Sequence, residues 1–166
     1  RSIDYPETTM YEALMISVKR VPDKVAWDFM GTLCTYDAFG RAIERCAEAL
    51  AGLGLKKGDT ITISMPTTPQ GIICFYAVNR LGAVASMIHP LSTQTEIEFY
   101  LTISNSTMAL TIDAFYPKFS AAMEKTACKT LILAKIGDYL SPVKKFGFWV
   151  TRGRKIPKVP QDKRVF

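Results

Sequence analysis

Apolar positions recur along this chain with two different periods. Between residues 36 and 54 they fall every three or four residues, at Phe39, Ile43, Cys46 and Leu50, while charged residues occupy the positions between them. This spacing predicts an amphipathic helix with one buried face. Residues 60–65 (TITISM) are instead rich in β-branched side chains, which predicts a short buried strand. The chain therefore mixes helices and strands from its first half onward.

Two Thr-x-x-Glu segments, at 9–12 and 93–96, have the spacing of a capping box. In this motif the Thr oxygen and the Glu carboxylate each accept from a free backbone N–H at the start of a helix. We predict helices that begin there and run to about Arg20 and Ser104. Thr68 followed by Pro69 predicts a third helix start, with Pro at the first helical position.

The remaining pattern alternates short apolar strands with helices. It predicts a hairpin over 25–35, strands over 60–65, 83–88, 108–112 and 130–134, and helices over 70–81 and 118–125. Strands separated by helices imply an α/β fold, with a parallel sheet covered on both faces through right-handed crossovers. The helix over 70–81 is apolar nearly all round, so we expect neighbours on more than one of its sides.

Composition excludes several classes of protein. With 48% hydrophobic residues in 166, the chain can bury a core, and no run of apolar residues reaches the length that a membrane span needs. The start of the chain has no secretory signal pattern. Its four cysteines lack metal-binding spacing, and the single histidine excludes a multi-histidine site. These features predict reduced thiols, no metal and a cytoplasmic protein.

The net charge of +6 is concentrated near the C-terminus. Residues 139–161 contain no acid but include Lys144, Lys145, Arg152, Arg154, Lys155 and Lys158, while the rest of the chain has no basic stripe that would indicate nucleic-acid binding. Residues 136–166 show no clear period, which predicts an irregular basic tail after an α/β portion at 1–135. Its aromatic and basic residues fit a weak membrane-surface contact, or a connector that packs on further parts of the protein; the missing helical period favours the connector.

Several short motifs occur in a familiar order. Thr35-Tyr-Asp37 is followed by 55–59 (LKKGD), 63–66 (ISMP), 75–84 (FYAVNRLGAV) and 89–92 (HPLS). Over roughly residues 9–134 this series resembles the opening of the adenylate-forming superfamily, which includes acyl-CoA synthetases, firefly luciferase and the adenylation domains of peptide synthetases. The tail segments 155–160 (KIPKVP) and 162–166 (DKRVF) resemble the stretch that membrane-associated fatty-acid–CoA ligases place before their phosphate loop.

The resemblance implies a reaction whose groups this sequence lacks. In the family, an acyl carboxylate attacks the α-phosphate of Mg-ATP, and the CoA thiolate then attacks the acyl-adenylate. The family's phosphate loop, a Thr, Ser and Gly run ending in Pro-Lys-Gly, does not occur here. We therefore expect an incomplete N-terminal portion of the large domain of an acyl-CoA synthetase. The parent would use ATP, Mg and CoA, and this portion would be inactive, with no catalytic residue and no bound cofactor.

Two alternatives remain open. The parent enzyme could adenylate an amino acid or transfer its product to a carrier protein, because the groups that select the acceptor are not among these residues. The chain could also be a self-sufficient α/β binding module whose basic tail meets a membrane or a partner. A partial enzyme would have the remainder of the enzyme as its partner. Alone, it would leave a sheet edge and an apolar face bare, so it would self-associate or bind a hydrophobic dye.

Four residues are candidate contacts for CoA because of the resemblance. His89 and Ser92 lie in the loop after the second parallel strand, where open α/β sheets bind ligands and where related ligases pass the pantetheine of CoA. Lys118 and Lys125 flank the helix predicted over 118–125, a region that offers cations to the phosphates of CoA in some synthetases. The competing interpretation is that His89 only orders its loop and that both lysines are solvated.

Overall fold

The computed structural model describes residues 3, 6–151, 153, 156–157, 159 and 163–166. The chain begins with helix α1 (Met10–Arg20), the antiparallel hairpin β1 (Val25–Phe29) and β2 (Thr32–Thr35), and the long helix α2 (Tyr36–Gly52). The predicted capping box at the start of α1 is confirmed, because the Thr9 and Glu12 side chains each accept from the other residue's backbone N–H. The predicted hairpin is confirmed as well.

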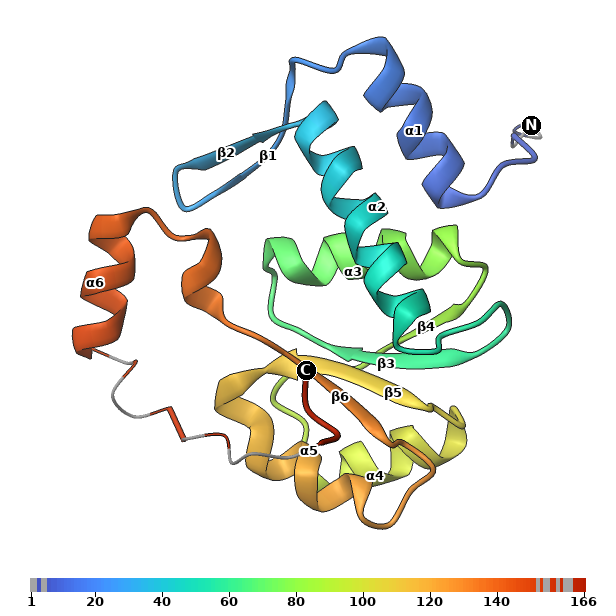
Figure 1. Ribbon diagram of the computed structural model, residues 1–166, viewed down its shortest axis with the longest axis vertical. Helices are drawn as coiled ribbons and strands as arrows, with labels where there is room; N and C mark the ends of the chain where they lie inside the picture. The colour runs from blue at the N-terminus through green and yellow to red at the C-terminus, as the bar shows by residue number, and fades with distance from the viewer. Residues whose placement is uncertain (1–2, 4–5, 152, 154–155, 158, 160–162) are drawn as a thin grey trace.

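Four parallel strands form the centre of the molecule. They are β3 (Thr60–Ser64), β4 (Val84–Met87), β5 (Met108–Ile112) and β6 (Thr130–Ala134), in the order β4-β3-β5-β6. The connecting helices are α3 (Pro69–Arg80), α4 (Gln94–Ile103) and α5 (Tyr116–Met123), the last after a short turn η1 (Asp113–Phe115). Helices α2 and α3 cover one face of the sheet, and α4 and α5 cover the other (Figure 1). The predicted helix-flanked parallel sheet is confirmed.

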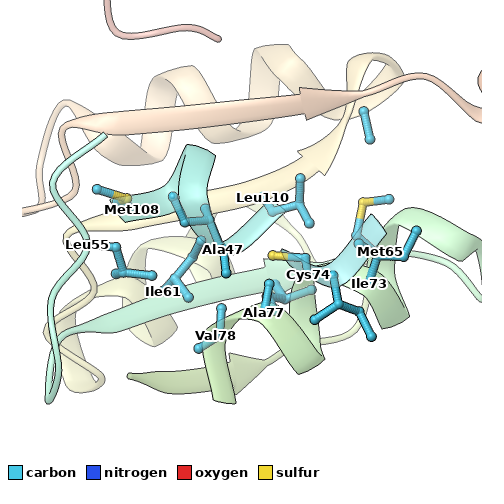
Figure 2. Packing of buried hydrophobic residues seen from close by; sticks show 14 of the residues in the cluster. Ala47, Leu55, Ile61, Met65, Ile73, Cys74, Ala77, Val78, Met108 and Leu110 are labelled. Carbon is cyan, nitrogen blue, oxygen red and sulfur yellow. The ribbon is translucent and has the colours of Figure 1, made fainter. Parts of the chain in front are cut away.

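Helix α3 lies at the centre of the larger core. Figure 2 shows its Cys74 and Ala77 packed towards Ile61 of β3 and Ala47 of α2. Helix α1 packs on the outer side of α2 and α3, so α3 has neighbours on several sides, as its apolar sequence predicts. A smaller core on the opposite face of the sheet is built from α4, α5 and β6 around Phe119, which is fully buried.

The helix start at Thr68 differs from the prediction in one respect. Thr68 is the N-cap of α3 and Pro69 is at the first helical position, but the Thr68 side chain makes no capping hydrogen bond. Its buried Oγ1 has no partner in the described part of the chain. The extended backbone of Thr68 and the fixed φ of Pro69 thus start the helix without help from the hydroxyl.

The prediction of an irregular tail was wrong. The described residues contain a turn η2 (Ile136–Tyr139) and a helix α6 (Pro142–Thr151). In α6, Val143, Phe146 and Val150 recur at steps of three and four, a short period that Gly147 and the lysines obscure in the sequence. The division at residue 135 stays a prediction.

The end of the chain returns to the sheet. Val165 forms a parallel bridge with Leu131, and the Leu131 N–H donates to the Arg164 carbonyl at 2.8 Å. The C-terminal residues therefore cover the β6 edge of the sheet. The basic residues Arg152, Arg154, Lys155 and Lys158 lie outside the described residues.

Candidate functional site

The candidate site lies at the carboxyl edge of the parallel sheet. Strand β3 connects through α3 to β4 on one side, while the chain then crosses back past β3 to β5 on the other side. The connections that leave β3 and β5 therefore diverge, and in open α/β sheets ligands bind at such a point. The loop after β4 and the turn after β5 border this edge.

His89 is held in the loop after β4 by its own neighbours. Its backbone carbonyl accepts from the Ser92 N–H at 3.1 Å and from the Ser64 hydroxyl at 3.5 Å. Its Nδ1 accepts from the Leu91 N–H at 3.2 Å, which places the proton of the neutral ring on Nε2. The loop-ordering interpretation of His89 is therefore supported. The imidazole is nevertheless exposed, so Nε2–H remains a donor that a ligand can use.

Ser92 and Lys118 lie beside each other. The half-buried Lys118 donates from Nζ to the Ser92 carbonyl at 3.3 Å, and its ammonium lies 5.7 Å from the centre of the Phe115 ring. Ser92 itself is 7% exposed. The structure thus brings His89, Ser92 and Lys118 together at one end of the sheet, although the sequence places Lys118 far from the other two.

Glu96 adds a negative charge to this group. Hydrogen bonds from the Thr93 backbone N–H and hydroxyl lower the pKa of its carboxyl, with a smaller contribution from the nearby His89 and Lys118. The prediction that Glu96 closes a cap is confirmed, because Thr93 and Glu96 form a complete capping box at the start of α4. A carboxylate next to Lys118 weakens the attraction of this site for an anion.

Lys125 does not join this group. It follows the end of α5, about 10 Å further along the helix axis than Lys118 at the usual rise per residue. Its Nζ donates to the Glu98 carboxylate at 3.1 Å. Only three of the four predicted CoA contacts are therefore neighbours in space.

The sequence pattern did not single out a second group at the same edge. Asp113 follows the last residue of β5 and Lys135 follows the last residue of β6; together with Asp138 they line a cavity of about 400 Å³ beneath α6. Burial raises the pKa of Asp113, opposed by the hydrogen bond from the Ala114 N–H and by the charge of Lys135. The sequence could have indicated this group through the positions of Asp113 and Lys135, because polar residues directly after adjacent parallel strands converge at one edge of the sheet.

The chemistry that these residues can support is polar binding. No group of three or more His, Cys, Asp or Glu side chains suited to a metal ion occurs among the described residues. The first group offers an imidazole, an ammonium and a buried serine near one carboxylate. None of the described helices has the length and apolar character to cross a membrane.

Comparison with known proteins decides the family. The sequence profile of the AMP-binding enzyme family matches residues 15–148. The chain belongs to the AMP-binding enzyme family. Among curated members, the long-chain-fatty-acid–CoA ligase of Bacillus subtilis (strain 168) is 28% identical over 151 residues, which are 91% of this chain and 27% of that protein.

Solved structures of AMP-binding enzymes share the fold. The long-chain-fatty-acid–CoA ligase of Archaeoglobus fulgidus has a TM-score of 0.74 at 19% identity. The matched region covers 80% of this chain and 28% of the chain of that ligase. The anthranilate CoA ligase AuaEII, solved with anthranoyl-AMP, has a TM-score of 0.75 at 20% identity. The matched region covers 98% of this chain and 30% of the AuaEII chain. The chain thus spans about a quarter of the length of the AMP-binding enzymes that it matches.

Proposed function

We propose that this chain is the N-terminal scaffold of an ATP-dependent acyl-CoA ligase that acts on a fatty acid. In the complete enzyme, the carboxylate would attack the α-phosphate of ATP with loss of pyrophosphate, and the CoA thiolate would then displace AMP from the acyl-adenylate. The observation that carries the proposal is the family match over residues 15–148, together with relatives such as the Bacillus ligase that match the chain over about a quarter of their length.

The chain on its own has no group for the adenylation step. That step requires cationic and backbone donors directed at the phosphates, and this sequence contains no Ser/Thr/Gly run closing in Pro-Lys-Gly. We therefore propose that the 166-residue chain neither binds Mg-ATP nor forms an acyl-adenylate. Its contribution is a rigid sheet whose carboxyl edge positions loops for the rest of the enzyme.

The loop after β4 is proposed to contact CoA. The exposed His89 imidazole and the buried Ser92 offer hydrogen bonds suited to the amide groups of pantetheine. The site fits the phosphates of CoA less well, because Glu96 lies near Lys118 and Glu98 pairs with Lys125. We propose a pantetheine contact by His89 and Ser92, with Lys118 holding the loop through the Ser92 carbonyl.

Calorimetry on the purified chain tests the first part of this proposal. Titration with Mg-ATP is expected to give no saturable heat, because the phosphate-binding groups are absent. Saturable ATP binding at micromolar affinity would contradict the scaffold assignment. For the CoA contact, His89→Ala in the complete enzyme is expected to raise KM for CoA several-fold with little change in kcat. Lys125→Ala is the matched control, and an equal effect of both changes would contradict the pantetheine contact.

A further inference from the structure

Two cysteine side chains meet where α2 crosses α3. Figure 1 shows α2 lying across α3, and the two helices pack against each other. Cys46 comes from α2 and Cys74 from α3, and their thiols are hydrogen-bonded to each other. A disulfide requires the Cβ atoms of two cysteines to lie close and to point towards each other. Thiols that already share a hydrogen bond are placed to form one.

The two thiols differ in their exposure to small molecules. Cys74 is 3% exposed and lies within the larger core, as Figure 2 shows, whereas Cys46 is half-buried. Both line a cavity of about 220 Å³, together with the half-buried Gln70 and Tyr139 and several apolar side chains. A cavity of this size holds molecules larger than water. A small oxidant can therefore reach Cys46 while α2 and α3 stay packed.

The shared hydrogen bond gives the two thiols different roles. The bond from Cys74 lowers the pKa of Cys46 and outweighs the opposite effect of burial. The same bond, together with burial, raises the pKa of Cys74. Burial also raises the pKa of Cys34 and Cys128, so Cys46 is the one cysteine of the four whose pKa is lowered. Because the thiolate is the nucleophile, Cys46 should react first and Cys74 should follow.

We propose that Cys46 and Cys74 form a reversible disulfide when the chain meets a hydroperoxide. The Cys46 thiolate attacks one oxygen of hydrogen peroxide, so that an S–O bond forms, the O–O bond breaks and hydroxide leaves. The Cys74 sulfur then attacks the sulfur of the Cys46 sulfenic acid, the S–O bond breaks, and the leaving hydroxide takes the Cys74 proton. Counting the proton first lost by Cys46, two thiols and one peroxide give one disulfide and two waters.

The packing excludes one other partner for Cys46 and disfavours the second. Cys128 belongs to the smaller core on the opposite face of the sheet. Cys34 lies on β2, and its thiol donates to the Thr35 carbonyl at 3.5 Å. Disulfides in reducing compartments are usually transient and redox-sensing, which fits a pair that stays reduced until an oxidant appears. The proposal rests on α2 and α3 alone and is independent of the ligase assignment.

Peptide mapping of the full 166-residue chain tests the proposal. The native chain is treated with hydrogen peroxide, its free thiols are blocked with N-ethylmaleimide, and it is digested without reductant for mass spectrometry. The expected main cross-link joins the peptide of Cys46 to that of Cys74 within one molecule, and dithiothreitol should restore both thiols. A mixture of ¹⁵N-labelled and unlabelled chains identifies bridges between molecules. Bridges mainly between molecules or between other cysteines, or a Cys46 oxidised while Cys74 stays free, would overturn the proposal.

Serine variants assign the two roles. In Cys74→Ser, the sulfenic acid of Cys46 has no thiol to react with, so dimedone should label Cys46 several-fold more than in the parent. Cys46→Ser should lose both the bridge and the dimedone label, while Cys34→Ser, the matched control, should keep the bridge. Circular dichroism confirms that each variant is folded, and the peptide map of the parent needs no variant. An unchanged dimedone label in Cys74→Ser, or loss of the bridge in Cys34→Ser, would contradict the assignment.

Discussion

Glu96 shows how a single capping residue couples the fold to pH. Its folded-state pKa lies below the ordinary value of 4.5 because Thr93 donates two hydrogen bonds to the carboxylate. A carboxyl with a lowered pKa contributes stability above its unfolded-state pKa and loses that contribution as the pH falls through the folded-state pKa. The capping box of α4 therefore stabilises the fold at neutral pH and weakens in acid.

Replacing Glu96 tests this coupling. Glu96→Gln should unfold at lower urea concentration than the parent at neutral pH, and the difference should shrink as the pH falls below 4.5, the ordinary pKa of the carboxyl. Glu48→Gln, at another exposed helical glutamate, is the control. If the difference in stability between Glu96→Gln and the parent stays constant as the pH falls, the charge of the carboxylate contributes nothing to the cap.

The four thiols differ in how far burial suppresses their ionisation. Burial raises the pKa of Cys128 to about 11, and a hydrogen bond from the Cys74 thiol lowers the pKa of Cys46. Because the thiolate is the nucleophile, iodoacetamide should label Cys46 well before Cys128 in the native chain. Peptide mass spectrometry measures the order, and labelling of Cys128 at the rate of Cys46 would contradict the burial of Cys128.

At the scale of single residues, polar contacts could be predicted from the sequence only in part. Both capping boxes follow from local spacing, and the hydrogen bond from the Lys56 N–H to the Asp59 carboxylate, at 2.8 Å, is equally local. The buried bond between the Thr62 and Ser106 hydroxyls, at 2.7 Å, could not be predicted. It joins residues from different elements, and its existence depends on the tertiary packing of the loop before β5.

At the scale of elements, the smaller core depends on one face of α4. Leu101 is completely buried there, whereas Phe99 on the same helix is 58% exposed. Leu101→Ala should lower the free energy of unfolding by about 2–5 kcal/mol, because it removes buried methyl groups and leaves a cavity. Phe99→Ala should change it by no more than about 0.5 kcal/mol. Urea denaturation measures both, and similar losses for the two variants would contradict this assignment of the helix faces.

Most elements could be predicted because their periods are long and clear. The strand β5 and the helices α2 and α3 match the apolar pattern closely, with ends shifted by a residue or two. Helix α6 was missed because its ten residues offer few repeats and because Gly147 and the two lysines interrupt the apolar pattern. The return of Val165 to the edge of β6 was missed because strand pairing across a long separation leaves no local pattern.

For the whole molecule, the uncovered edge of the sheet is the main feature that points to a partner. In the described part of the chain, β4 pairs with β3 on one side only, and Val84, Met87 and Leu91 nearby are each more than half exposed. Exposed apolar side chains beside an open strand edge favour association with other protein surfaces. The rest of the enzyme is the proposed partner for this region.

This edge gives a prediction for the isolated chain. The 166-residue chain should bind a hydrophobic dye and self-associate as its concentration rises. Met87→Lys should reduce both, because it places a charge on the open edge strand. Sedimentation velocity and dye fluorescence report the two effects. Leu33→Lys, at a 63% exposed residue of the separate β1–β2 hairpin, is the control. A chain that stays monomeric and does not bind the dye would contradict the prediction of an exposed sheet edge.

The measurement that bears most directly on the scaffold assignment is fatty-acid-dependent exchange of pyrophosphate into ATP. It should be run on the 166-residue chain and on the product of the whole reading frame that encodes it. The account predicts exchange by the longer product and none by the chain alone. Exchange by the chain alone, or a reading frame that stops at Phe166, would contradict it.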